Sequence, residues 1–210
     1  MKEIKKGFTL AEILITISTV GIIAAITIPA IVNISQERSF EAAADRTAVL
    51  LEEGIVNVFQ RANENNNPDE GAVMTLSATT VNNVLGAGND FLSQNTVLFD
   101  TCGSILGLDR VAAVNENSYK NQVRTAANVA VAGWNTYNVY EMRKINSFIT
   151  VQPVTAANAS TNVDDRELTR IYIDANGDKA PNRMYDQNVF PKGDIFEYRL
   201  LNNGHITRVR

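Results

Sequence analysis

The sequence is poor in the side chains that most often carry out chemistry. Its 210 residues include one cysteine, Cys102, and one histidine, His205. A single cysteine excludes an intramolecular disulfide, and without an evident activating neighbour we expect Cys102 to be a structural thiol. His205 follows a turn motif and is expected to be exposed rather than to act as a base. No nucleotide-binding glycine loop, zinc-ligand spacing or serine-centred motif occurs, so an enzyme is not expected.

Positive charge is also scarce beyond the N-terminus. The formal net charge is −4, although the first seven residues carry three lysines against one glutamate. A nucleic-acid-binding protein needs a basic stripe to neutralise phosphates, and none is evident, so no direct nucleic-acid partner is indicated. The length and the hydrophobic content of 45% suit one membrane helix followed by one globular domain of about 150 residues.

One long stretch almost lacks charge. Residues 8–32 contain a single charged side chain, Glu12, and the twenty residues 13–32 contain none. Twenty helical residues cover roughly 30 Å, which is the thickness of the hydrocarbon core of a bilayer. The apolar run is longer than that of a secretory signal peptide and has no convincing cleavage site, so we interpret it as a retained anchor. The preceding Lys2, Lys5 and Lys6 predict that the N-terminus stays on the cytoplasmic side and that the bulk of the chain crosses the membrane.

The head of this stretch has a specific pattern. Residues 7–12 read Gly-Phe-Thr-Leu-Ala-Glu after a short basic leader. This pattern resembles the type III signal of type IV pilins and type II secretion pseudopilins, and the resemblance covers residues 1–59 well and the remainder only in outline. It implies that a prepilin peptidase cleaves between Gly7 and Phe8 and methylates the new amino group of Phe8.

Glu12 is a candidate functional residue because a charged side chain in a lipid-facing helix costs about 2.5–3.5 kcal/mol on insertion scales. Cleavage after Gly7 would create a positive amine on Phe8, four residues away. In a helical filament, the amine of one subunit can lie against Glu12 of its neighbour, so that both charges are neutralised where water is excluded. The alternative is that Glu12 lies close to the membrane interface and stays hydrated without a partner.

The helix is predicted to continue beyond the membrane segment. Apolar or small residues recur at spacings of three and four, which is typical of one helix face: Phe40, Ala44, Thr47, Leu51, Ile55 and Val58. We therefore expect one helix from about Thr9 to Arg61, roughly 80 Å long. Pro29 removes a hydrogen bond to the Ala25 carbonyl and predicts a bend or local melting. The resemblance implies that this region loosens on assembly, and a passive kink is the alternative.

The remainder is predicted to form a small globular head. A loop rich in Asn, with Pro and Gly, at 63–71 marks its start, and 72–132 are expected to form short helices and irregular segments. The three-residue spacing of Trp134, Tyr137 and Tyr140 indicates one packed helical face or a loop. Strand-forming residues occur in four later segments: 148–151, 168–173, 196–200 and 206–209. The last two flank Asn202-Asn203-Gly204, a strong hairpin signal.

These elements predict an α+β, pilin-like fold in which a long N-terminal helix packs on a small antiparallel sheet. The predicted divisions are a leader peptide at 1–7, a helix at 8–62 with its transmembrane half at 8–32, and an extracytoplasmic head at 63–210.

One acidic, turn-rich stretch in the head is a candidate metal site. Alternating Asp and Asn oxygens around a glycine turn suit Ca²⁺, which takes six to eight oxygen ligands. The spacing does not match an EF-hand, because Gly177 stands at the fourth position instead of the sixth. The stretch resembles the C-terminal loop of major pseudopilins, where calcium orders the loop in place of a disulfide. The alternative is a surface turn without metal. The candidate ligands are Asp174, Asn176, Asp178, Asp186 and Asp194.

The resemblance implies a structural subunit that needs no cofactor beyond this possible Ca²⁺. Such a prepilin is first a single-pass inner-membrane protein with a periplasmic head and then part of a type IV pilus or a type II secretion pseudopilus. Its implied partners are the prepilin peptidase, further copies and related pilins, the assembly platform and its ATPase. The competing hypothesis is a membrane-anchored extracytoplasmic binding domain that never polymerises.

Overall fold

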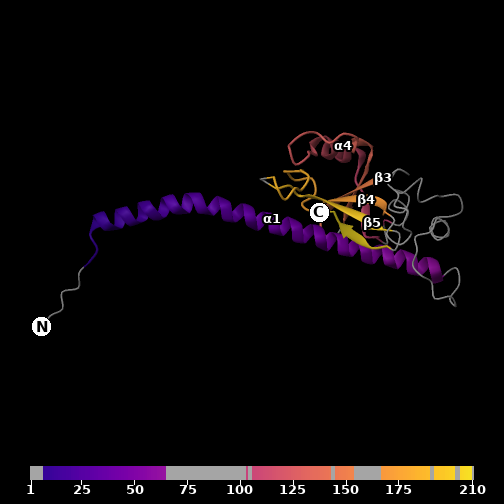
Figure 1. Cartoon of the computed structure of the whole chain (residues 1–210), viewed down its shortest axis with the longest axis horizontal. Helices are drawn as coiled ribbons and strands as arrows, with labels where there is room; N and C mark the ends of the chain where they lie inside the picture. Colours follow the sequence, from indigo (N-terminus) through magenta and orange to yellow (C-terminus); the bar gives the residue numbers. More distant parts are fainter. Residues whose placement is uncertain are drawn as a thin grey trace. The chain divides into compact units, whose positions relative to one another are not determined.

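The computed structural model describes residues 7–64, 103, 106–142, 145–153, 167–189, 192–201 and 204–209. The leader up to Lys6, most of the predicted Asn-rich loop, Cys102 and the Asn202-Asn203 turn lie outside these residues. The named elements are α1 (Leu10–Glu64), β1 (Leu108–Arg110), α4 (Ala113–Gln122), the 3-10 helix η1 (Trp134–Thr136), β2 (Asn138–Met142), β3 (Ser147–Pro153), β4 (Glu167–Asp174), β5 (Ile195–Leu201) and β6 (Ile206–Arg208) (Figure 1). The prediction of an α+β fold with a long N-terminal helix is confirmed.

The chain divides into two compact units, residues 1–38 and 39–210. Helix α1 begins in the first unit and continues for 55 residues. It passes through Pro29 without interruption, so the structure contains no melted segment at the position where the proline predicted a bend or melting. The N-terminal part of α1 is long and apolar enough to cross a membrane.

The second unit is built on one antiparallel sheet. Its six strands lie in the order β1-β2-β3-β4-β5-β6, so each strand pairs with its neighbour along the chain. The four predicted strands are confirmed as β3 to β6. Within the predicted hairpin, Leu200 pairs with Ile206, and Gly204 adopts φ +85°, which suits a tight turn.

Of the two interpretations of the aromatic triplet, the single helical face is wrong. Trp134 lies in η1, whereas Tyr140 lies in strand β2, where it pairs with Ile149 of β3. The two side chains belong to different hydrophobic clusters. The three-residue spacing of the aromatic side chains suits a helix, but hydrogen bonding to β3 holds Asn138–Met142 in the extended conformation of a strand.

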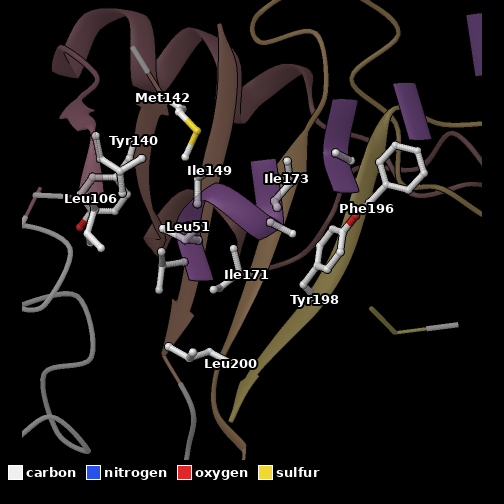
Figure 2. Close-up of a cluster of buried hydrophobic side chains, with 14 of the residues drawn as sticks. Leu51, Leu106, Tyr140, Met142, Ile149, Ile171, Ile173, Phe196, Tyr198 and Leu200 are labelled. Atoms are coloured by element: carbon white, nitrogen blue, oxygen red, sulfur yellow. The ribbon is translucent and has the colours of Figure 1, made fainter. Parts of the chain in front are cut away.

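The first hydrophobic cluster lies between α1 and one face of the sheet. Figure 2 shows Leu51 of α1 among the side chains of Ile149, Ile171 and Ile173 from neighbouring strands. Alternation along each strand directs these residues to the same face. The predicted face of α1 is confirmed for Ala44, Thr47, Leu51 and Ile55, which are fully buried, and Phe40 packs partly buried against the same cluster. The side chain of Val58 lies outside the described part of the chain. The Thr47 hydroxyl donates to the Ala43 carbonyl oxygen at 2.8 Å, which satisfies its hydrogen-bonding group.

The second cluster covers the opposite face of the sheet. Tyr119 and Val123, at the end of α4, and Trp134 of η1 pack on Val139 and Phe148 from the strands. Figure 1 shows α4 across the sheet from the adjoining part of α1. Both faces are therefore buried, and the loops at the sheet's ends lie beside two cores.

We predict that Leu51→Ala lowers the free energy of unfolding by about 2–5 kcal/mol, because it removes a fully buried side chain and leaves a cavity. Urea denaturation of the full chain in detergent, followed by the fluorescence of the single tryptophan, measures this change. The matched control is Val49→Ala on the same helix, where the side chain is 56% exposed. Equal effects of the two substitutions would contradict the assigned face.

Candidate functional site

The start of α1 is organised around Glu12. Its Oε2 atom accepts hydrogen bonds from the backbone N–H and the hydroxyl of Thr9, each at 2.8 Å. In return, the Thr9 hydroxyl oxygen accepts the N–H of Glu12 at 3.3 Å. This reciprocal arrangement is a capping box, which satisfies free donors at a helix start. Glu12 therefore has a local partner that neither sequence-based alternative included, although the Thr-Leu-Ala-Glu spacing was its signal.

The apolar part of α1 exposes hydrophobic side chains on all sides, from Leu10 to Val32. Its hydroxyl groups are satisfied by its own backbone: Thr16 donates to Glu12 O at 2.9 Å, and Ser18 donates to Leu14 O at 2.7 Å. Thr27 does the same with Ile23 O at 3.0 Å. A segment whose polar groups are satisfied internally can lie in lipid or against other helices without an unmet hydrogen bond.

A second candidate site lies where β4 ends and β5 begins. Asp174, the last residue of β4, is fully buried. Its Oδ2 accepts a hydrogen bond from the Tyr119 hydroxyl at 2.9 Å, and its Oδ1 accepts one from the Asn176 N–H at 3.2 Å. Burial, together with the nearby charge of Asp194, raises the pKa of Asp174 well above its ordinary value.

Asp194 is the second fully buried carboxylate. Its Oδ1 accepts the N–H of Arg183 at 2.8 Å, and its Oδ2 accepts the N–H of Asn182 at 3.2 Å. Burial raises the pKa of Asp194, although these backbone hydrogen bonds oppose the increase. The structure thus places two acidic groups of like charge together away from water, which is costly unless a proton or a cation balances them.

The glycine before Asp194 is required by this packing. A Cβ atom at Gly193 would overlap the backbone carbonyls of Arg183 and Met184. At the same point, the segments that contain Gly193 and Arg183 are joined by a hydrogen bond: the Asp194 N–H donates to the Arg183 carbonyl oxygen at 3.0 Å. Close approach of the backbone therefore fixes the position from which the Asp194 carboxylate projects.

Two buried amide oxygens of the same turn have no hydrogen-bond partner among the described residues. They are Oδ1 of Asn176 and Oδ1 of Asn182, and Asn182 is only 1% exposed. Within the described parts of the chain, no ion pair with lysine or arginine involves Asp174 or Asp194. Two carboxylates and two unsatisfied amide oxygens match the all-oxygen donor set that a hard divalent cation prefers.

The five candidate ligands do not all meet. Asp174, Asn176 and Asp194 form the buried cluster, and Asp178 is exposed on the same turn, where its charge contributes to the raised pKa of Asp174. Asp186 accepts the N–H of Asn188 at 2.8 Å and lines a different cavity of about 760 Å³, together with Glu41. Among the described residues, no group of three or more His, Cys, Asp or Glu side chains is arranged to hold a metal. Any cation here therefore has two charged ligands, and amide or other oxygens complete its shell.

Sequence reasoning missed two neighbours of this cluster. Asn182 lies within the acidic stretch, so its residue type was a usable signal. Tyr119 precedes Asp174 by 55 residues in the sequence, and no local pattern connects the two.

We predict that the stability contributed by the two buried carboxyls in a chelating buffer falls as pH rises above about 4, the ordinary pKa of an aspartate. A carboxyl whose pKa is raised by folding contributes stability that is complete below its unfolded-state pKa and is lost as pH rises through its folded-state pKa. The pKa values of both Asp174 and Asp194 are raised. Asp174→Asn removes one of the two charges, so its melting temperature should fall less over the same range.

Thermal unfolding in EDTA at a series of pH values measures this difference. Groups whose pKa is lowered by folding are present in both the wild type and Asp174→Asn, so their effects cancel in the comparison. Glu116 is one such group: burial acts to raise its pKa, but hydrogen bonds from Lys120 and the Val139 N–H lower it. Asp178→Asn, at an exposed position, removes only the smallest of the effects that raise the pKa of Asp174, so its pH dependence should lie closer to the wild type than to Asp174→Asn. The same pH dependence in Asp174→Asn and wild type would contradict the assignment.

The N-terminal capping box and the buried carboxylate pair are thus the two candidate sites within the described residues. Comparisons of the chain with protein-family models, with curated proteins and with solved structures give no match. The functional argument is therefore made from the residues and their contacts.

Proposed function

We propose that this protein is a prepilin-type structural subunit. It is cleaved after Gly7, held in the inner membrane by residues 8–32 and polymerised through α1 into a type IV pilus or a type II secretion pseudopilus. The observation that supports this most directly is the first part of α1. It follows Gly7 and Phe8, carries Glu12 as its single charge to Val32, and exposes apolar side chains on every side.

An apolar surface of this kind is not stable in water. A helix that is hydrophobic all round belongs in lipid or inside a protein assembly. Before assembly, the apolar surface of the helix can lie in lipid, and after assembly it can lie against the identical helices of further copies. Both are favourable because the hydroxyl groups of the helix are bonded to its own backbone and need no outside partner. The same segment can therefore serve as membrane anchor and as filament core, with the prepilin peptidase, platform and ATPase as the partners that the resemblance implies.

Glu12 then supplies the charged contact between subunits. Cleavage would give Phe8 a positive amine, and Phe8 is 85% exposed beside the capped helix start. Inside a filament, this amine and the carboxylate of a neighbouring copy would neutralise one another. An anchored binding domain that never polymerises is the alternative, and it requires no such pair.

In the head, we propose that the cluster of Asp174, Asn176, Asn182 and Asp194 binds Ca²⁺. The unpartnered oxygen of the buried Asn182 favours this over a metal-free turn. The cation would supply the positive charge that the two carboxylates lack. A single cysteine cannot form an intramolecular disulfide, so the cation would also take the place of a disulfide in holding the connection between β4 and β5.

N-terminal peptide mass spectrometry on protein from its native membrane tests processing. We predict a chain that begins at methylated Phe8. A chain that still begins at Met1, or that begins beyond Ala25, would reject the prepilin proposal.

Two substitutions at Glu12 separate charge pairing from local helix capping. Gln at this position keeps the side-chain oxygen of a capping box but has no charge, whereas Ala has neither. We predict that Glu12→Gln and Glu12→Ala both abolish filament assembly while membrane insertion stays intact, as measured by sheared-filament yield and membrane fractionation. Normal assembly of Glu12→Gln would show that the charge is dispensable and would favour a capping role.

Calcium should stabilise the full chain in detergent. A ligand that binds only the folded state at 100 times its dissociation constant adds about 2.7 kcal/mol. We predict this gain for the wild type and for Asp178→Asn, and little gain for Asp194→Asn. Denaturation in calcium and in EDTA measures it. No gain for the wild type would reject the cation site without affecting the assembly proposal.

A further inference from the structure

Helix α4 is bonded directly to the proposed cation site. The hydroxyl of Tyr119 donates to Asp174 Oδ2 at 2.9 Å, and one turn later Gln122 Oε1 accepts the side-chain N–H of Asn182 at 3.3 Å. Tyr119 is 2% exposed, and its ring packs edge-on against Phe148 with centroids 5.0 Å apart. A buried aromatic ring has little freedom to turn, so the phenol holds the Asp174 carboxylate in one orientation.

The chain immediately after α4 is joined to the same turn through its backbone. The N–H of Arg124 donates to the Asn182 carbonyl oxygen at 3.0 Å, and the N–H of Met184 donates to the Arg124 carbonyl oxygen at 2.9 Å. Residues 182–184 are thus bonded on one side to the end of α4 and on the other to Asp194, through the N–H groups of Asn182 and Arg183. The position of α4 and the position of the ligands depend on one another.

The first half of α4 has a separate attachment. Glu116 is buried, accepts the N–H of Val139 at 3.0 Å and pairs with Lys120 at 2.9 Å. The Val139 contact leads to strand β2 and the Lys120 contact lies within α4, so neither reaches the β4–β5 connection. The end of α4 is therefore the part whose anchoring includes the two buried carboxylates.

We infer that Tyr119 is a positioning residue for a divalent cation held by Asp174, Asn176, Asn182 and Asp194, and that cation binding fixes the C-terminal half of α4 on the sheet. This inference rests on the calcium site proposed above. Groups that hydrogen-bond a ligating side chain orient it, and their loss typically weakens metal binding 10- to 100-fold. Linkage is reciprocal: if the docked end of α4 strengthens cation binding, the cation strengthens docking by the same factor.

Isothermal titration of the full chain in detergent with calcium chloride tests the positioning role. Tyr119→Phe keeps the ring on Phe148 and removes only the hydroxyl, so we expect calcium affinity to fall about tenfold. Tyr137→Phe is the matched control, because it removes a hydroxyl from the same aromatic cluster and should bind calcium like the wild type. Unchanged affinity in Tyr119→Phe would overturn the positioning role.

Hydrogen–deuterium exchange of the wild-type chain provides a measurement that needs no variant. Calcium should slow exchange in peptides covering 119–124 more than in peptides covering β2. Equal exchange with calcium and with EDTA would overturn the coupling to α4, provided that titration shows calcium bound. If titration shows no binding to the wild type, the cation site itself fails, and this inference fails with it, so the two failures are distinguishable.

Discussion

One helix carries two different kinds of surface along its length, and this constraint governs the rest of the structure. Up to Val32, α1 exposes apolar side chains on all sides, whereas from Ala44 to Ile55 it buries one face and leaves charged residues on the others. Every regular helix satisfies its backbone hydrogen bonds internally, so the same backbone suits lipid, a filament core and the surface of a sheet. Only the distribution of side chains has to change along its length.

The sheet meets this helix with one face and is covered by α4 and η1 on the other. An antiparallel sheet commonly leaves one face in water. Covering the second face removes water from the end of β4, where Asp174 projects towards Tyr119. The buried carboxylates are therefore a consequence of two-sided packing. Their charge has to be balanced by a proton or by a cation, and this requirement is the physical basis of the cation site proposed above.

The parts of the fold that could be predicted depend on local patterns. Spacings of three and four along α1 identified Ala44, Leu51 and Ile55, because helical periodicity is present in a single segment. Strand β1 has only three residues. In β2, the adjacent residues Val139 and Tyr140 are both buried, so burial does not simply alternate along the strand. The extended form of both segments therefore depends on pairing with later strands. Composition located the acidic turn, but it could not separate Asp194, which is buried in the cluster, from Asp186, which lies elsewhere.

The capping box changes the argument about Glu12, since local capping and pairing between subunits are compatible. Both bonds from Thr9 go to one carboxylate oxygen, Oε2. A carboxylate has about four acceptor positions, so the group can hold its own helix start and still accept an amine from a neighbouring copy. Because the cap already restricts the side chain, forming the pair would cost less conformational entropy than ordering a free glutamate. In the proposed filament, the Thr-Leu-Ala-Glu sequence would then supply a preoriented acceptor at the helix end where the new amine is made.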